Sequence, residues 1–384
     1  MKLKNLILFG FSLVVTITFS GCGGGGSSSN KNTLVQTGTF SDGNLENIVQ
    51  YYQEKHNVPA LSALTINIDG ETEFSEIGEK QYSSGNIVSS NNHWGFGSIT
   101  KSMTATLTAA MIEDNILQWS TTLSEVFPEF PNMQDRYKNI TVVELLSHSA
   151  GMPQDNDEVW EDYVEDLRVA IEQRYEFTQD ALEYESDEPQ GEFLYSNANY
   201  VITASILEKL SGKSFELLME EYLFTPLGMN NTYVDVSNQY DDIWGHKEEN
   251  GIWKSIDPTI NSVDNALILA PAGSRTFLSL EDVSKYLLLH LKAKSGEYEY
   301  LSKESFEKLH TQVLLADEDL AYSLGWYVEG DYGLQHSGSN SRWFSLAFIN
   351  KDTKTAHFVS TNSATIDSQN AVFEMMQQLT ARVK

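Results

Sequence analysis

Ser98 and Lys101, a serine and a lysine three residues apart, could form a reactive pair in this sequence. They stand in WGFGSITKSM, where an apolar run begins, and one helical turn brings residues three apart to the same face. A serine hydroxyl becomes a good nucleophile only when a base takes its proton. A lysine can be that base when it is neutral or shares a proton, because free lysine has a pKa of about 10.4. A phosphate-binding loop is excluded, since Thr100 stands where that loop needs glycine.

Two later segments offer partners for this pair. GEFLYSNANY places Tyr195 and Asn197 directly before an expected helix. A tyrosine beside a lysine can act as acid or base, and an asparagine can orient a substrate amide. Two structural alternatives stay open: Tyr195 as a core aromatic residue, and Asn197 or Ser196 as a helix cap. YGLQHSGSNSRWF places His336 at the end of an expected strand.

The elements that must position these residues follow from hydrophobic periodicity and turn signals. The pattern predicts a helix, then a hairpin around Asp69-Gly70, a buried helix, mostly helical sequence, further strands and a closing helix. The helical segments are 45–54, 99–112, about 142–290 and 368–382. Strands at both ends predict an α+β fold, in which an antiparallel sheet built from N- and C-terminal strands is flanked by helices. A mostly helical lobe, about residues 100–290, is inserted into it and leaves a cleft where the lobes meet.

The three motifs resemble, in type and order, those of the penicillin-recognising serine hydrolases. Ser-x-x-Lys, Tyr-x-Asn and His-Ser-Gly are similar to the branch with a tyrosine, which holds class C β-lactamases, serine D-Ala-D-Ala carboxypeptidases, D-aminopeptidases and related esterases. Three further segments, LLSHSAGMP, YLFTPLGMNNTYVD and APAGSRTFLSLEDVSKYLLLHL, extend the resemblance over about residues 45–380. The resemblance implies that family's α+β fold and acyl transfer, with no metal or organic cofactor.

The resemblance also implies a role for each matching residue. Ser98 would be the acylated nucleophile, Lys101 and Tyr195 the proton-transfer pair, and Asn197 a group that orients the substrate. The backbone N–H groups of Ser98 and Ser339 would form the oxyanion hole. The substrate would be a small molecule or peptide: an ester, a D-amino-acid peptide or amide, or a β-lactam. The alternative is a non-catalytic penicillin- or peptide-binding lipoprotein of the envelope.

Three positions depart from the family pattern, and a fourth matches it without a clear role. His336 stands where β-lactamases usually have a lysine, and a histidine of ordinary pKa is mostly neutral at pH 7. Ser274 replaces a usual glycine. Arg342 also replaces a glycine; it could bind a substrate carboxylate, but we expect it at the surface. His148, in LSHSAG, is expected to be a structural turn residue rather than a catalytic one.

The charge of the chain is strongly negative. With 25 Lys+Arg against 54 Asp+Glu, the formal net charge is −29, which excludes a nucleic-acid partner. Residues 155–188 hold 14 acidic residues and two arginines, in a region that borders the cleft mouth in the resembled family. Such a field would disfavour anionic substrates. Exposed acidic helices with no bearing on the substrate are the alternative.

The N-terminus has the pattern of a secretory signal. Lys2 and Lys4 precede an apolar run over residues 6–19, which is too short for a membrane span, and Ser20-Gly21-Cys22 follow. The junction resembles a bacterial lipoprotein signal, in which the cysteine is acylated and becomes the first mature residue. An ordinary signal peptide is the alternative.

We therefore predict a signal peptide over residues 1–21, a flexible Gly/Ser tether over 22–40 and a hydrolase domain over 41–384. The expected location is the bacterial cell envelope, on the periplasmic face of the outer membrane through a lipid on Cys22. The outer membrane is favoured because Gly23, rather than an acidic residue, follows the cysteine.

Overall fold

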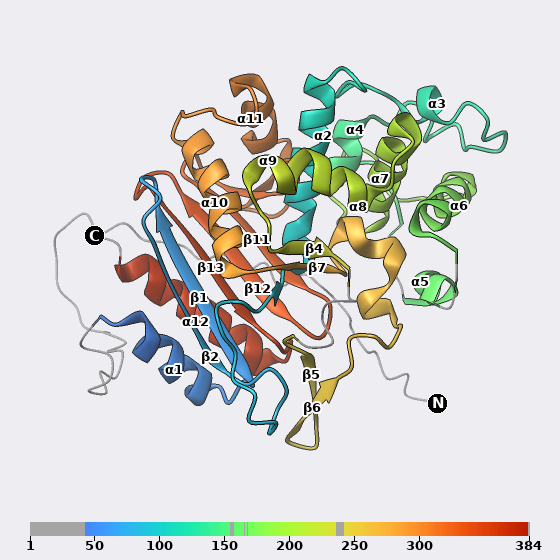
Figure 1. The fold of residues 1–384 in the computed structure, drawn as a ribbon. Helices are drawn as coiled ribbons and strands as arrows, with labels where there is room; N and C mark the ends of the chain where they lie inside the picture. The colour runs from blue at the N-terminus through green and yellow to red at the C-terminus, as the bar shows by residue number, and fades with distance from the viewer. Residues whose placement is uncertain (1–42, 154–156, 165, 167, 236–241, 383–384) are drawn as a thin grey trace.

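An eight-stranded antiparallel sheet organises the fold of this chain (Figure 1). The computed structural model describes residues 43–153, 157–164, 166, 168–235 and 242–382. The sheet order is β2-β1-β13-β12-β11-β10-β9-β8. Its strands are β1 (Ala60–Asn67), β2 (Thr72–Gly78), β8 (Leu314–Leu315), β9 (Ala321–Tyr322), β10 (Tyr327–Glu329), β11 (Gly333–Ser339), β12 (Phe344–Asn350) and β13 (Thr355–Thr361). The pairing of β1 with β13 confirms the predicted sheet built from both ends of the chain.

Helices cover both faces of this sheet, as the alternation of side chains in its strands requires. In β12, Phe344, Leu346 and Phe348 face one apolar cluster, whereas Ala347 and Ile349 face the other. The first cluster is covered by α1 (Leu45–Lys55) and α12 (Ile366–Arg382). The opposite face packs against α10 (Leu280–Lys294). The expected terminal helices and the hairpin at Gly70 are confirmed.

The inserted lobe surrounds α2 (Thr100–Glu113), a helix with every residue from Thr100 to Met111 buried. Its other α-helices are α3 (Leu123–Val126), α4 (Val142–Leu146), α5 (Asp157–Val164), α6 (Ala170–Glu183), α7 (Ala198–Ser211), α8 (Phe215–Met219) and α9 (Thr225–Leu227). The lobe is less purely helical than the sequence predicts. It also contains the small sheets β3-β7-β4 and β5-β6. Their strands are β3 (Trp94–Gly95), β4 (Thr232–Val234), β5 (Gly245–Glu249), β6 (Ile252–Ile256) and β7 (Thr276–Leu278).

A buried ion pair fastens the acidic segment to the rest of the lobe. Arg174 on α6 is completely buried and lies 2.6 Å from a carboxylate oxygen of Glu208 on α7. It lies 3.1 Å from Glu216 on α8. Its guanidinium also donates to the carbonyl oxygen of Leu267, at 3.3 Å. Leu267 opens the 3₁₀ segment η5 (Leu267–Ala272), which leads into the site described below.

The predicted signal peptide and tether lie outside the described residues. Among the helices that the structure describes, none combines the length and the apolar character needed to cross a bilayer.

Candidate active site

Ser98 sits on a tight turn between β3 and α2, in the 3₁₀ segment η1 (Gly97–Ile99). The turn depends on glycine. Gly97 has a φ of +54°, and a Cβ there would lie 2.5 Å from the backbone nitrogen of Ser339. A Cβ on Gly273 would lie 1.9 Å from the carbonyl oxygen of Gly97. Side chains are therefore excluded on both sides of the turn, while Ser98 itself remains partly exposed, as a nucleophile must.

Lys101 lies one turn further on, and its ammonium group has an acceptor for each of three N–H bonds. Nζ donates to Ser98 Oγ at 3.1 Å, to Asn197 Oδ1 at 2.6 Å and to the carbonyl oxygen of Ala272 at 3.0 Å. The side chain is completely buried. Three donated hydrogen bonds fit a protonated lysine, which has three donors and no acceptor, whereas a neutral lysine would accept from the Ser98 hydroxyl at the same distance.

Tyr195 and Asn197 reach the same point from the start of α7. The ring centroid of Tyr195 lies 4.8 Å from Lys101 Nζ, and that of Tyr200 lies 5.5 Å away. Asn197 occupies the N-cap position of α7 but makes no capping hydrogen bond with its side chain. Its amide oxygen accepts from Lys101 instead, so the helix-cap alternative for Asn197 is wrong. Tyr195 is only half-buried, unlike a core aromatic residue.

The end of β11 touches the nucleophile turn through its backbone. A Cβ on Gly338 would lie 2.1 Å from the carbonyl oxygen of Phe96 and 2.9 Å from the backbone nitrogen of Ser98. Together with the contact of Gly97 with Ser339, this places the amide nitrogens of Ser98 and Ser339 on neighbouring backbone segments. Two adjacent N–H groups beside a serine hydroxyl are the elements of an oxyanion hole.

His336 lies in the same neighbourhood but carries no charge. Its Nδ1 donates to the carbonyl oxygen of Ser337 at 2.6 Å, and its Nε2 lies 3.3 Å from the hydroxyl of Tyr322. Burial, reinforced by the positive charge of Lys101, lowers the pKa of His336 to about 3. The imidazole is therefore neutral near pH 7, and the positive charge that a lysine would supply here is missing.

The surface position expected for Arg342 is wrong. Arg342 is only 5% exposed, its Nε lies 3.3 Å from Asp264 and its Nη2 donates to the Ser262 hydroxyl. These partners lie about 80 residues away in the sequence, so no local pattern reveals the burial. Ser274, the other departure, is also buried and donates from its hydroxyl to the carbonyl oxygen of Ala266 at 2.7 Å.

Sequence reasoning missed several groups at the site. Ala272 contributes a backbone carbonyl, which leaves no side-chain signature, although it lies in the segment APAGS that resembles the family. The sequence analysis assigned no role to Tyr200 or Tyr322, which are completely buried and lie beside Lys101 and His336 respectively. The glycine at position 273 was the signal available in the sequence, because an isolated glycine often marks close backbone approach, and its φ of +115° agrees with this.

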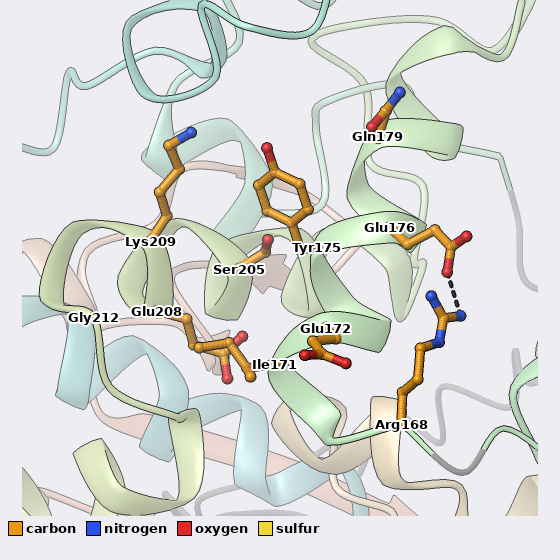
Figure 2. Close-up of a pocket in the computed structure, with 10 residues that line it drawn as sticks. All are labelled: Arg168, Ile171, Glu172, Tyr175, Glu176, Gln179, Ser205, Glu208, Lys209 and Gly212. Carbon is orange, nitrogen blue, oxygen red and sulfur yellow. Dashed lines mark ion pairs between the residues drawn. The ribbon is translucent and has the colours of Figure 1, made fainter.

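A separate groove of about 660 Å³ lies between α6 and α7 (Figure 2). None of the predicted site residues lines it. Its wall includes the ion pair of Arg168 with Glu176, together with Tyr175, Glu208 and Lys209. Within the described ranges, no group of three or more His, Cys, Asp or Glu side chains is arranged to hold a metal ion.

The fold and the site define the class of β-lactamases and penicillin-binding proteins. A large antiparallel sheet is flanked by helices and carries an inserted lobe. The Ser-x-x-Lys pair lies at the start of α2, the buried helix of that lobe. The chain belongs to the beta-lactamase family, because the sequence model of that family matches residues 45–374. Membership supports a serine hydrolase.

Individual relatives are distant. Penicillin-binding protein 4 of Amycolatopsis lactamdurans is 24% identical over 306 residues, which cover 76% of this chain and 77% of that protein. Unguisins hydrolase ungD of Aspergillus violaceofuscus is 26% identical over 210 residues, covering 50% of this chain and 34% of that protein. A beta-lactamase of Yersinia enterocolitica is 25% identical over 229 residues, covering 57% and 53%. The matches thus span about a third to three quarters of these relatives.

A solved structure has the same fold. The octameric penicillin-binding protein homologue from Pyrococcus abyssi superposes with a TM-score of 0.72 at 24% identity. The superposition covers 88% of this chain and 77% of that one. The predicted α+β fold is therefore confirmed.

Proposed function

We propose that this protein is a serine hydrolase that works through an acyl-enzyme on Ser98. The observation that carries the proposal is the hydrogen bond from Lys101 Nζ to Ser98 Oγ, made by a buried lysine that also contacts Asn197 and the ring of Tyr195. A structural lysine would gain nothing from burial beside a partly exposed serine, because desolvating an ammonium group costs several kcal/mol.

The proton path follows from these contacts. Ser98 Oγ attacks the substrate carbonyl carbon, and its proton passes to the Lys101–Tyr195 pair, which holds one proton fewer than its full complement. With Lys101 as an ammonium group, Tyr195 is the base, because the cation near its ring stabilises the negative charge of a phenolate. The N–H groups of Ser98 and Ser339 stabilise the oxyanion.

The same proton then reaches the leaving oxygen or nitrogen as the carbonyl–leaving group bond breaks. In the second half of the reaction, water attacks the ester on Ser98 and gives its proton to the pair, which returns one to Ser98 Oγ. Each half-reaction therefore begins and ends with the same protonation state of Lys101 and Tyr195.

We propose that neutral esters or D-amino-acid amides are cleaved in preference to β-lactams and to other substrates that carry a free carboxylate. The neutral His336 and the Arg342 side chain, already paired with Asp264, support this preference. Neither group is placed to give a carboxylate a charge-assisted hydrogen bond, which is worth about 1.5–3 kcal/mol.

The test is labelling followed by intact mass measurement. The full chain is incubated with a fluorophosphonate and with a fluorescent penicillin, beside Ser98→Ala as the matched control. We expect one adduct on Ser98 in the wild type and none in the variant, together with hydrolysis of a short acyl ester. Stable acylation without any turnover would favour the alternative of a penicillin-binding lipoprotein, and equal turnover by Ser98→Ala would contradict the mechanism.

We also propose that the hydrolase is attached to the bacterial envelope through a lipid on Cys22. The basic start, the apolar run and the Ser-Gly-Cys junction support this attachment. The Gly/Ser segment that follows would let the domain reach substrates away from the membrane surface.

A further inference from the structure

His148 occupies an unusual backbone position in the turn that follows α4. Its φ is +59°, in the left-handed region where residues other than glycine are uncommon. The side chain is completely buried. Strained backbone of this kind persists only where the surroundings fix it, and it clusters at functional sites. The position therefore raises the question of what this histidine holds in place.

Its hydrogen bonds enclose Tyr195. The carbonyl oxygen of His148 accepts from the backbone N–H of Leu194 at 2.8 Å, and its ring Nδ1 accepts from the backbone N–H of Ser196 at 3.2 Å. These are the two residues on either side of Tyr195. The imidazole also packs against the phenol ring, with centroids 4.3 Å apart. One residue thus holds the backbone before and after Tyr195 as well as its ring.

The hydrogen bond to Ser196 requires a neutral ring with no proton on Nδ1. A backbone N–H can only donate, so the proton of the neutral imidazole is on Nε2. Burial, with the positive charge of Lys101 and the neighbouring His336 as smaller causes, lowers the pKa of His148 well below its ordinary value. The acceptor on Nδ1 is therefore present throughout the neutral pH range.

Packing alone does not explain a histidine here. Its Nε2 is buried without a hydrogen-bond partner among the described residues, and an unsatisfied buried donor costs about 1–3 kcal/mol. An apolar ring would fill the same space without that cost. What the apolar ring would lack is the acceptor on Nδ1, which also lies 3.2 Å from the side-chain nitrogen of Asn199.

We propose that His148 is a positioning residue for Tyr195, which it holds beside Lys101 through the amide hydrogen bonds on both sides and the contact between the rings. The inference rests on the proposed function, because it assumes that Tyr195 transfers protons. It replaces the expectation of a purely structural turn residue. Displacing a reacting group by about 1 Å can slow a reaction by about 10²-fold, so loss of the acceptor should appear in the rate.

The experiment compares three substitutions in the full chain. His148→Asn keeps an oxygen close to the position of Nδ1 and tolerates the left-handed backbone. His148→Leu has nearly the same size but no acceptor, and His148→Gln places its amide oxygen one bond further out. Thermal unfolding, the rate of Ser98 labelling by a fluorophosphonate between pH 5 and 9, and ester kcat and KM are measured for each.

We expect His148→Leu and His148→Gln to slow labelling and lower kcat by about 10²-fold, with little change in KM and a shifted pH–rate profile. His148→Asn should recover most of the rate. If His148→Leu does not fold, the difference in labelling rate and kcat between His148→Gln and His148→Asn tests the role of the acceptor. Folded Leu or Gln variants with the wild-type rate and pH profile would overturn the inference while leaving the mechanism intact, as would an Asn variant as slow as they are. A wild type that is not labelled on Ser98 would overturn both proposals.

Discussion

The neutral state of His336 predicts how the selectivity of the enzyme depends on pH. With a pKa lowered to about 3, the imidazole is uncharged in nearly every molecule at pH 7. Both of its nitrogens already have partners, Ser337 and Tyr322. A substrate carboxylate therefore gains no charge-assisted hydrogen bond from this residue.

The missing bond sets the size of the effect. One charge-assisted hydrogen bond is worth about 1.5–3 kcal/mol, which corresponds to a roughly 10- to 100-fold change in kcat/KM. A carboxylate that enters the site without a charged partner also loses its hydration, which costs a similar amount of free energy. We therefore expect an N-acyl D-amino-acid dipeptide amide to be cleaved faster than the same dipeptide with a free carboxylate by roughly 10- to 100-fold in kcat/KM. The two substrates differ only in the charge of the terminal group, so they form a matched pair.

The pH dependence separates this explanation from others. A histidine of ordinary pKa, about 6.5, would become charged below that pH, and the preference would shift toward the free acid between pH 8 and pH 5. With the lowered pKa of His336, the ratio of the two kcat/KM values should stay constant across this range. Competition between the two substrates, followed by mass spectrometry, measures the ratio directly.

Two variants serve as controls for the ratio of the kcat/KM values of the amide and the free acid. His336→Gln keeps a neutral hydrogen-bonding side chain and should leave the ratio unchanged. His336→Lys adds the missing charge and should narrow the gap, most strongly at low ionic strength. Faster cleavage of the free acid, with an advantage that grows below pH 6.5 and is lost in His336→Gln, would refute the reasoning.

Three other predictions concern the proton-transfer pair, the lobe and the N-terminus. Lys101→Ala and Tyr195→Phe should each slow acylation of Ser98 by roughly 10²–10⁴-fold in stopped-flow labelling, and wild-type rates in either variant would contradict their role. Arg174→Met leaves buried Glu208 unpaired and should lower the free energy of unfolding in urea by about 3–5 kcal/mol. Arg168→Gln, which breaks an exposed pair, should cost less than about 1 kcal/mol, and equal losses would argue against the buried network. Cys22→Ser should leave an uncleaved precursor in a bacterial host, whereas wild-type protein free in the periplasm without added mass on Cys22 would refute the lipid anchor.

Much of the fold was predictable because its signals are local. The apolar run after Ser98 becomes a helix buried on nearly all sides. The helix expected after GEFLYSNANY becomes α7, which ends at Ser211 and is capped by Gly212 with a φ of +72°. The strands of the last third form the sheet with β1, as expected from strands at both ends. The small sheets of the lobe were not predicted. β5 is mostly polar and exposed, and β6 lacks a strict alternation of apolar and polar residues. β3, β4 and β7 have only two or three residues each, so their patterns are too weak to indicate strands.

The sequence by itself determined which residues meet at the candidate site, because the type, spacing and order of short motifs are properties of the chain. Ser98, Lys101, Tyr195 and Asn197 do converge, with Lys101 between Ser98 and Asn197. Only the tertiary structure decided the burial, the charge and the hydrogen-bond partners of each side chain.

The reason is physical, since charge and hydrogen bonding depend on burial and on partners that are distant in the chain. His336 loses its charge because it is buried beside Lys101, 235 positions earlier in the printed sequence. Arg342 is withdrawn from the surface by Asp264. His148, expected to support a turn, is brought against Tyr195 by contacts between two segments about 50 residues apart. No pattern within either segment carries that information.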